Sequence, residues 1–150
     1  LDDRKAHFLL RAAISLKGRP VTLYQEVHCN KTKEKPATHK AFLKTLHAML
    51  PSNCRPIIVT DAGYKSPWFR EVLALGWDIV GRVRKPHFYS LDSGNTWQCI
   101  RHLYAQATSR PKRFDNSQIV RSNPFACTLV LFKQKSKGRH ASNPDGTRKA

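Results

Sequence analysis

One acidic residue occupies the position at which α/β proteins usually place their catalytic groups. Asp61 directly follows a short apolar run, residues 56–60, which predicts a strand buried on both faces of a sheet. The carboxyl ends of such strands form the edge at which α/β folds place their reactive groups. The small residues Ala62 and Gly63 leave space in front of the carboxylate. We therefore predict Asp61 as a catalytic residue, with the capping of a turn as the alternative.

A single carboxylate does not complete a site for phosphoryl transfer. Two Mg²⁺ ions about 4 Å apart require several oxygen ligands. The four cysteines form no C-x-x-C pair, which argues against a structural zinc site. They are Cys29, Cys54, Cys99 and Cys127.

The charge of the chain points to a polyanionic partner. The 150 residues include 27 Lys and Arg but 10 Asp and Glu, a formal net charge of +17. Residues 81–150 hold 14 basic and 3 acidic residues, so this half is where we expect a phosphate backbone. A solubility surface is the alternative. Hydrophobic content of 40% is typical of a globular domain, and no apolar run approaches the ~20 residues of a membrane helix.

Individual basic residues are candidates for contacts with nucleic acid. Arg82 and Arg84 share one face of a predicted strand over 77–84, which Lys85 follows, and solvated edge charge is the alternative. Trp97 has the chemistry to stack on an unpaired base, although a core tryptophan is the more ordinary role. The remaining phosphate-binding candidates are Arg110, Lys112, Arg113, Lys133, Lys135, Lys137 and Arg139.

The elements that position Asp61 follow from the apolar periodicity. Residues 7–17 and 21–28 alternate and predict an antiparallel hairpin whose apolar row runs from Phe8 to Leu16. Residues 37–50 predict a helix that Pro51 ends. A second helix starts at Ser66 as its cap and closes at Gly76, with an apolar side formed by Trp68, Phe69, Val72 and Leu73. With strands 56–60 and 77–84, these elements predict a mixed sheet with flanking helices.

The chain changes character after Pro86. Short strand-like pieces occur at 88–89, 96–100, 118–120 and 127–132, with polar or basic loops such as 109–117 between them and no convincing helix. The sequence thus predicts a core over 1–85, a β-rich insertion over 86–132 and a basic flexible tail over 133–150.

Three long stretches resemble bacterial insertion-sequence transposases. They are LLRAAISLKGRPVTLYQE, PIIVTDAGYKSPWFREVLALGWDIVGRVR and SNPFACTLVLFKQKSKGR. The resemblance is to the cut-and-paste, hairpin-forming DDE group. It implies a ribonuclease H-like core interrupted by a β-rich insertion. It also implies that Asp61 is the second acid of the catalytic triad and a ligand of two Mg²⁺ ions, which Mn²⁺ replaces in some cases.

The resemblance also sets expectations about partners and activity. It implies double-stranded DNA as partner, at transposon ends and at the target, a homodimer on DNA, and a nucleoid-associated location in the bacterial cytoplasm. The family's first Asp ends a strand before the hairpin, and its third acid, a Glu, lies after the insertion. By this resemblance Asp2 and Asp3 lie in the linker after that strand and are interpreted as solvated acids, and Glu71 comes too early to be the third acid. No residue here matches either position, so we expect this chain alone to be inactive. A non-catalytic DNA-binding remnant and a ribonuclease H-like nuclease outside the transposases are the other hypotheses.

Overall fold

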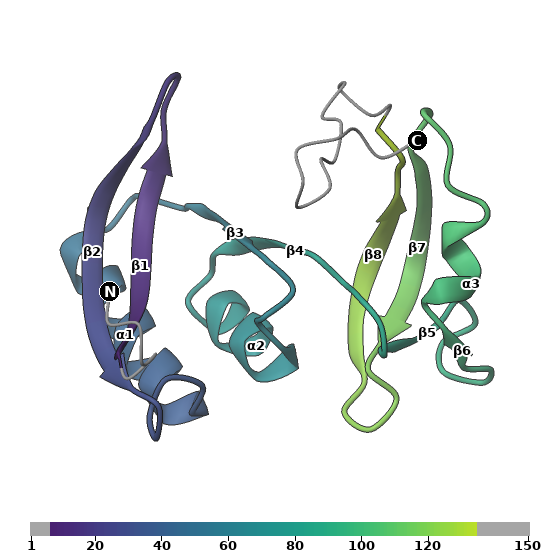
Figure 1. Cartoon of the computed structure of the whole chain (residues 1–150), viewed down its shortest axis with the longest axis horizontal. Helices are drawn as coiled ribbons and strands as arrows, with labels where there is room; N and C mark the ends of the chain where they lie inside the picture. The colour runs from purple at the N-terminus through teal and green to yellow at the C-terminus, as the bar shows by residue number, and fades with distance from the viewer. Residues whose placement is uncertain (1–6, 135–150) are drawn as a thin grey trace, which may run out of the picture. The chain divides into compact units, whose positions relative to one another are not determined.

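A computed structural model describes residues 7–134, which divide into two compact units between Arg82 and Val83 (Figure 1). The first unit contains β1 (His7–Ser15), β2 (Pro20–Cys29), α1 (Pro36–Met49), β3 (Ile57–Thr60), α2 (Ser66–Ala74) and β4 (Asp78–Gly81). The second contains β5 (Phe88–Ser90), β6 (Gln98–Cys99), α3 (Arg101–Tyr104), β7 (Lys112–Ile119) and β8 (Phe125–Leu131). The element order predicted for the first unit is confirmed, and the protein is mixed α/β.

Strands β1 and β2 form the predicted antiparallel hairpin. Leu10 is buried on the face toward α1, where the Tyr24 ring packs on the Phe42 ring with centroids 5.0 Å apart. The predicted apolar row is only partly buried, because Ile14 is 47% and Leu16 55% exposed. The reason is visible in Figure 1, where the tip of the hairpin extends beyond α1.

Helices α1 and α2 form the layer that covers one face of this unit. Helix α1 buries Phe42, Leu43 and Leu46, and Lys40 Nζ pairs with Glu71 Oε1 of α2 at 2.9 Å. These three buried residues follow the predicted helical spacing, whereas Met49, expected on the same face, is 55% exposed. Both helices carry a proline in the first turn, where a missing N–H costs no hydrogen bond.

The ends of α2 agree with the sequence at one terminus and differ at the other. Gly76 has φ +74° and donates its N–H to Leu73 O at 2.9 Å, as expected of a helix-ending glycine. The predicted capping role of Ser66 is wrong: Ser66 is already helical, the cap residue is Lys65, and no side chain caps the first turn. Leu73 was expected on the apolar side but is 46% exposed.

Strands β3 and β4 are parallel, with Thr60 opposite Gly81. The prediction that residues 56–60 are buried on both faces is wrong, because Ile57 is 63% and Val59 75% exposed. Helix α2 covers one face, where Phe69 packs against Gly81. Among the described residues of the first unit, no element covers the other face. An apolar run does not indicate whether a second layer covers a strand.

The first unit holds two separate sheets rather than one. The pair β1–β2 and the pair β3–β4 share no hydrogen-bonded strands among the described residues. The predicted continuous mixed sheet is therefore not present in this part of the chain. Within residues 7–134, no helix is both long and apolar enough to cross a bilayer.

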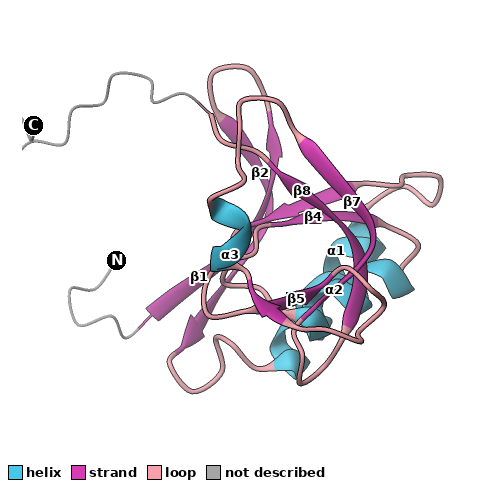
Figure 2. Ribbon diagram, turned by 90° about the vertical axis from the view of Figure 1, so that its right-hand side faces the viewer, coloured by secondary structure: helices cyan, strands magenta, loops and turns pink. Residues whose placement is uncertain are grey.

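The second unit is an antiparallel sheet in the order β6-β5-β7-β8. Figure 2 shows its long strands β7 and β8 in magenta and the short helix α3 in cyan. Most of the predicted loop 109–117 belongs to strand β7, because backbone pairing with β8 satisfies this polar segment. Arg113 pairs with Asp115 at 2.8 Å on its exposed side. The short helix α3 also lies in a region without a predicted helix and buries Leu103. The core of the second unit consists of Tyr89, Ile100, Leu103, Ile119 and Phe125.

Candidate functional site

Asp61 lies at the carboxyl end of the parallel strand β3, as predicted. Its Oδ1 accepts a hydrogen bond from the Gly63 N–H at 2.8 Å, so the carboxylate caps a turn. A Cβ added at Gly63 would lie 3.1 Å from the same oxygen, which explains the small residue there. The side chain is exposed, and Oδ2 has no hydrogen-bond partner among the described residues. Oδ1 of Asp61 thus has a structural role, whereas Oδ2 is available to bind a ligand or solvent.

An aromatic cluster flanks Asp61. The ring centroids of Tyr64 and Trp68 are 4.6 Å apart, and His39 of α1 lies 5.5 Å from Tyr64 and 5.4 Å from Trp68. Burial raises the pKa of Tyr64, and the nearby Asp61 carboxylate raises it further. Burial lowers the pKa of His39 and favours its neutral form. Sequence reasoning missed this cluster, because no spacing connects His39 with Tyr64 before the helices pack.

Three buried polar atoms near Asp61 have no hydrogen-bond partner within the described part of the chain. They are Thr60 Oγ1, Ser66 Oγ and Trp68 Nε1. All three belong to the short segment 60–68 that carries Asp61. Buried polar groups are normally satisfied, so their concentration here marks this segment as unusual.

The residues around Asp61 do not fit a two-metal centre. Residues 7–134 contain no group of three or more His, Cys, Asp or Glu side chains able to hold a metal ion. The unpartnered atoms are neutral hydroxyls and an indole N–H, whereas paired Mg²⁺ ions require several anionic oxygens. Glu71 is paired with Lys40, and Asp2 and Asp3 lie outside the described residues. Asp61 is one ligand of such a centre at most.

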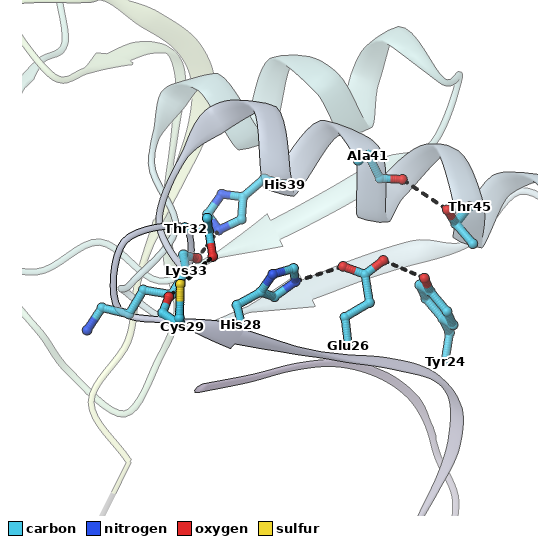
Figure 3. A network of polar contacts seen from close by, with 9 residues as sticks. All are labelled: Tyr24, Glu26, His28, Cys29, Thr32, Lys33, His39, Ala41 and Thr45. Atoms are coloured by element: carbon cyan, nitrogen blue, oxygen red, sulfur yellow. Dashed lines mark hydrogen bonds and ion pairs between the residues drawn. The ribbon is translucent and has the colours of Figure 1, made fainter. Parts of the chain in front are cut away.

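A second carboxylate of this unit is committed to a polar network beneath α1 (Figure 3). Tyr24, Glu26 and His28 follow one another on the inner face of β2. The Tyr24 hydroxyl donates to Glu26 Oε1, and His28 Nε2 lies 2.7 Å from Glu26 Oε2. The bond to Glu26 raises the pKa of Tyr24. Both carboxylate oxygens of Glu26 are therefore engaged, which removes it as a further catalytic acid.

The predicted basic pair after Asp61 is arranged differently from the expectation. Strand β4 ends at Gly81, so the prediction that Arg82 and Arg84 share a strand face is wrong. The Arg82 N–H still bonds Thr60 O at 3.3 Å, while Arg84 already belongs to the second unit. Both side chains are exposed, as is Lys85. They remain available to phosphates but not through a common strand geometry.

The other predicted phosphate contacts lie on the second unit. Arg110, Lys112, Arg113 and Lys133 are exposed. The Lys133 N–H donates to Thr108 O at 2.9 Å. Lys133 therefore lies beside the loop that carries Arg110. Arg113 is the member of this set that pairs with an acid, Asp115. Lys135, Lys137 and Arg139 lie outside the described residues.

Trp97 is held in a hydrogen-bonded loop. Its Nε1–H donates to Gly94 O at 2.9 Å, and the ring is half-buried, whereas Trp68 and Trp77 are 5% and 3% exposed. Asp92 braces the loop by accepting bonds from Ser90 and Thr96, which lower its pKa to about 2. Trp97 is thus the least buried of the three tryptophans, in a loop held by hydrogen bonds.

The comparisons with known proteins point to one family. A family model described as "Transposase DDE domain" matches residues 3–140. No curated protein and no solved structure matches the chain. Such a match implies a transposase-related function in an enzyme family that acts on DNA and generally uses divalent metals. The match covers most of the chain and includes Asp61, and we conclude that this chain belongs to the transposase DDE domain family.

Proposed function

We propose that this chain is the central part of the catalytic core of a bacterial cut-and-paste insertion-sequence transposase. The observation that carries the proposal is the position of Asp61 directly after a parallel strand, with one carboxylate oxygen unpartnered among the described residues. In this role Asp61 is the second of three catalytic acids. The hairpin-forming pathway, the action as a homodimer on transposon ends and the nucleoid-associated location belong to the same proposal.

The open edges of the two small sheets support a ribonuclease H-like arrangement. Strand β1 pairs only with β2, and β3 pairs only with β4, among the described residues. The same two helices cover both pairs, since α1 packs on β2 and on α2, and α2 packs on β4. One further strand between β1 and β3 would join the pairs into a single five-stranded sheet. We propose that this strand carries the first acid and that a later helix carries the third.

The charge distribution supports double-stranded DNA as the substrate. Neutralising each phosphate releases counterions, so affinity should fall steeply as salt rises. The exposed side chains Arg82 and Arg84 carry no ion pair within the described residues. By contrast, Lys40 pairs with Glu71 and Arg55 with Asp78.

The test of this partner compares two double variants of equal net charge. Binding of a labelled random-sequence duplex is measured across a range of salt concentrations. We expect Arg82→Ala with Arg84→Ala to reduce the salt slope by about 2, since each lost phosphate contact reduces it by about 1. The control, Lys40→Ala with Arg55→Ala, should change it much less. A flat salt response of the parent chain would contradict DNA binding, and equal slopes for both variants would remove Arg82 and Arg84 from the interface.

A non-catalytic DNA-binding module is the second candidate. The observation that favours it is the hydrogen bond from the Gly63 N–H to Asp61 Oδ1, which gives Asp61 a structural reason to be present. The two functions differ in one respect. A transposase core requires the charge of Asp61 for cutting, whereas a binding module requires only the hydrogen-bond acceptor.

A further inference from the structure

A hollow in the second unit combines an aromatic ring with two basic side chains. It has a volume of about 500 Å³ and is lined by Pro86, His87, Phe88, Val120, Arg121 and Ser122. This volume is within the range of sites for small molecules, roughly 300–1,000 Å³. None of the six residues belongs to the Asp61 site or to the predicted phosphate contacts.

The walls of the hollow are fixed by backbone hydrogen bonds. The Val120 N–H donates to Phe88 O at 2.9 Å, which ties the two walls to each other. The Ile100 N–H donates to His87 O at 2.9 Å, and the Asn123 N–H donates to Val120 O at 2.9 Å. The side chains that line the hollow therefore extend from a preorganised frame rather than from a loose loop.

Val120 has a backbone conformation that its residue type disfavours. Its φ is +62°, in the left-handed region, where a β-branched residue is a genuine outlier. Such strained conformations concentrate at active sites and at sites that clamp ligands. The strain lies at the turn that presents Arg121 to the hollow.

The side chains of the hollow have the chemistry of a nucleotide site. Phe88 is 41% exposed, although it lies beside the buried Tyr89 on β5. Arg121 is exposed, and neither Arg121 nor His87 pairs with an acid among residues 7–134. An aromatic ring offers a stacking surface to a base, and a guanidinium binds a phosphate.

We propose that this hollow binds one unpaired nucleotide of a DNA strand, with the base against Phe88 and the phosphate at Arg121 and His87. Bases within a duplex have both faces stacked, so only an unpaired base presents a face to a concave site. The inference rests on the proposed function for the identity of DNA as the partner. It adds a site that distinguishes an unpaired nucleotide from paired duplex.

The experiment compares two labelled DNAs by fluorescence anisotropy: a blunt duplex, and the same duplex with a single-stranded overhang of five thymidines. The parent chain should bind the overhang DNA more tightly. Phe88→Ala should weaken binding of the overhang DNA by at least about 5-fold, the lower bound for loss of one base–aromatic stack, and leave blunt duplex unchanged. Arg121→Ala should also reduce the preference for the overhang.

Matched controls come from the same unit. Phe132 is 51% exposed and Arg101 is exposed, and neither lines the hollow. Phe132→Ala and Arg101→Ala should retain the preference for the overhang. Circular dichroism of each variant establishes that it is folded.

A crosslinking measurement covers the case in which a variant fails to fold. With 5-bromodeoxyuridine in the overhang, irradiation of the parent chain should crosslink the DNA within residues 86–88 or 120–122. Crosslinks confined to other segments would overturn the proposal. So would equal losses on both DNAs for Phe88→Ala, or no loss on either. Absence of binding to any DNA would instead contradict the proposed function itself.

Discussion

The contact between Gly81 and Phe69 allows a quantitative test of how the Asp61 strand is held. A Cβ at Gly81 would lie 2.8 Å from Phe69 Cζ and 3.0 Å from Cε1, against about 3.5–4.0 Å for carbon atoms in contact. Phe69 is 6% exposed, so its ring has little room to move. Overpacking costs about 1–3 kcal/mol, and replacing glycine recovers roughly 0.5–1 kcal/mol of chain entropy. The difference is roughly 0–2.5 kcal/mol. Because the 2.8 Å contact is far inside the normal separation and the ring is buried, Gly81→Ala should lower the free energy of unfolding by about 1–2 kcal/mol, in the upper part of that range.

The assay is urea unfolding of the whole chain in a double-mutant cycle with Phe69→Leu. The smaller side chain removes the ring that the new Cβ would strike. The double variant should therefore be no less stable than Phe69→Leu alone, which appears as a coupling energy of about 1 kcal/mol or more. Strict additivity, or a Gly81→Ala variant as stable as the parent, would refute the contact. Because Gly81 is opposite Thr60, it would also refute our account of what positions Asp61.

Three further predictions concern single residues. Asp61→Asn should leave thermal stability unchanged, because an amide oxygen also accepts from the Gly63 N–H, whereas Asp61→Ala should lose about 1 kcal/mol; equal losses would exclude this turn. Asparagine tolerates a positive φ better than valine does, so Val120→Asn should raise the free energy of unfolding by about 1 kcal/mol. Asn116→Val, at φ +55°, should lower it by a similar amount. Changes of the opposite sign would contradict these backbone conformations. The folded pKa of Asp92, about 2, lies below its unfolded value, so the stability it contributes is present above about pH 4 and disappears as pH falls toward 2. Asp92→Asn should therefore make the free energy of unfolding depend less on pH in that window. An unchanged pH profile would contradict the hydrogen bonds to Asp92.

The first unit was predictable because its elements have clear apolar periods. The hairpin, α1 and α2 were each expected within a few residues of their observed bounds, since period two and period 3.6 are local properties. Burial was less predictable. Val59 has the sequence context of a doubly covered strand, yet it is 75% exposed. Whether a second layer covers a strand depends on segments far away in the sequence, which no local pattern reports.

The second unit shows the complementary limit. Residues 112–117 are mostly polar and lack an apolar row, yet they form most of β7 because the neighbouring strand β8 supplies the backbone hydrogen bonds. At the candidate sites, Asp61 was identifiable from its place after an apolar run. The aromatic cluster that flanks Asp61 and the strained turn at Val120 arise only from tertiary packing.

The central claim is that the charge of Asp61 serves DNA cutting, and one cleavage measurement tests it most directly. The DNA is a transposon-end duplex in Mg²⁺. The proteins are this chain, the chain joined to the segments encoded on either side of it, and that longer protein carrying Asp61→Asn. We predict that the longer protein cuts, that its Asp61→Asn form binds equally well without cutting, and that this chain alone does not cut, because residues 7–134 contain no metal-binding cluster. Cutting by the Asp61→Asn protein would contradict the account, because Asp61 would then be only a turn-capping residue.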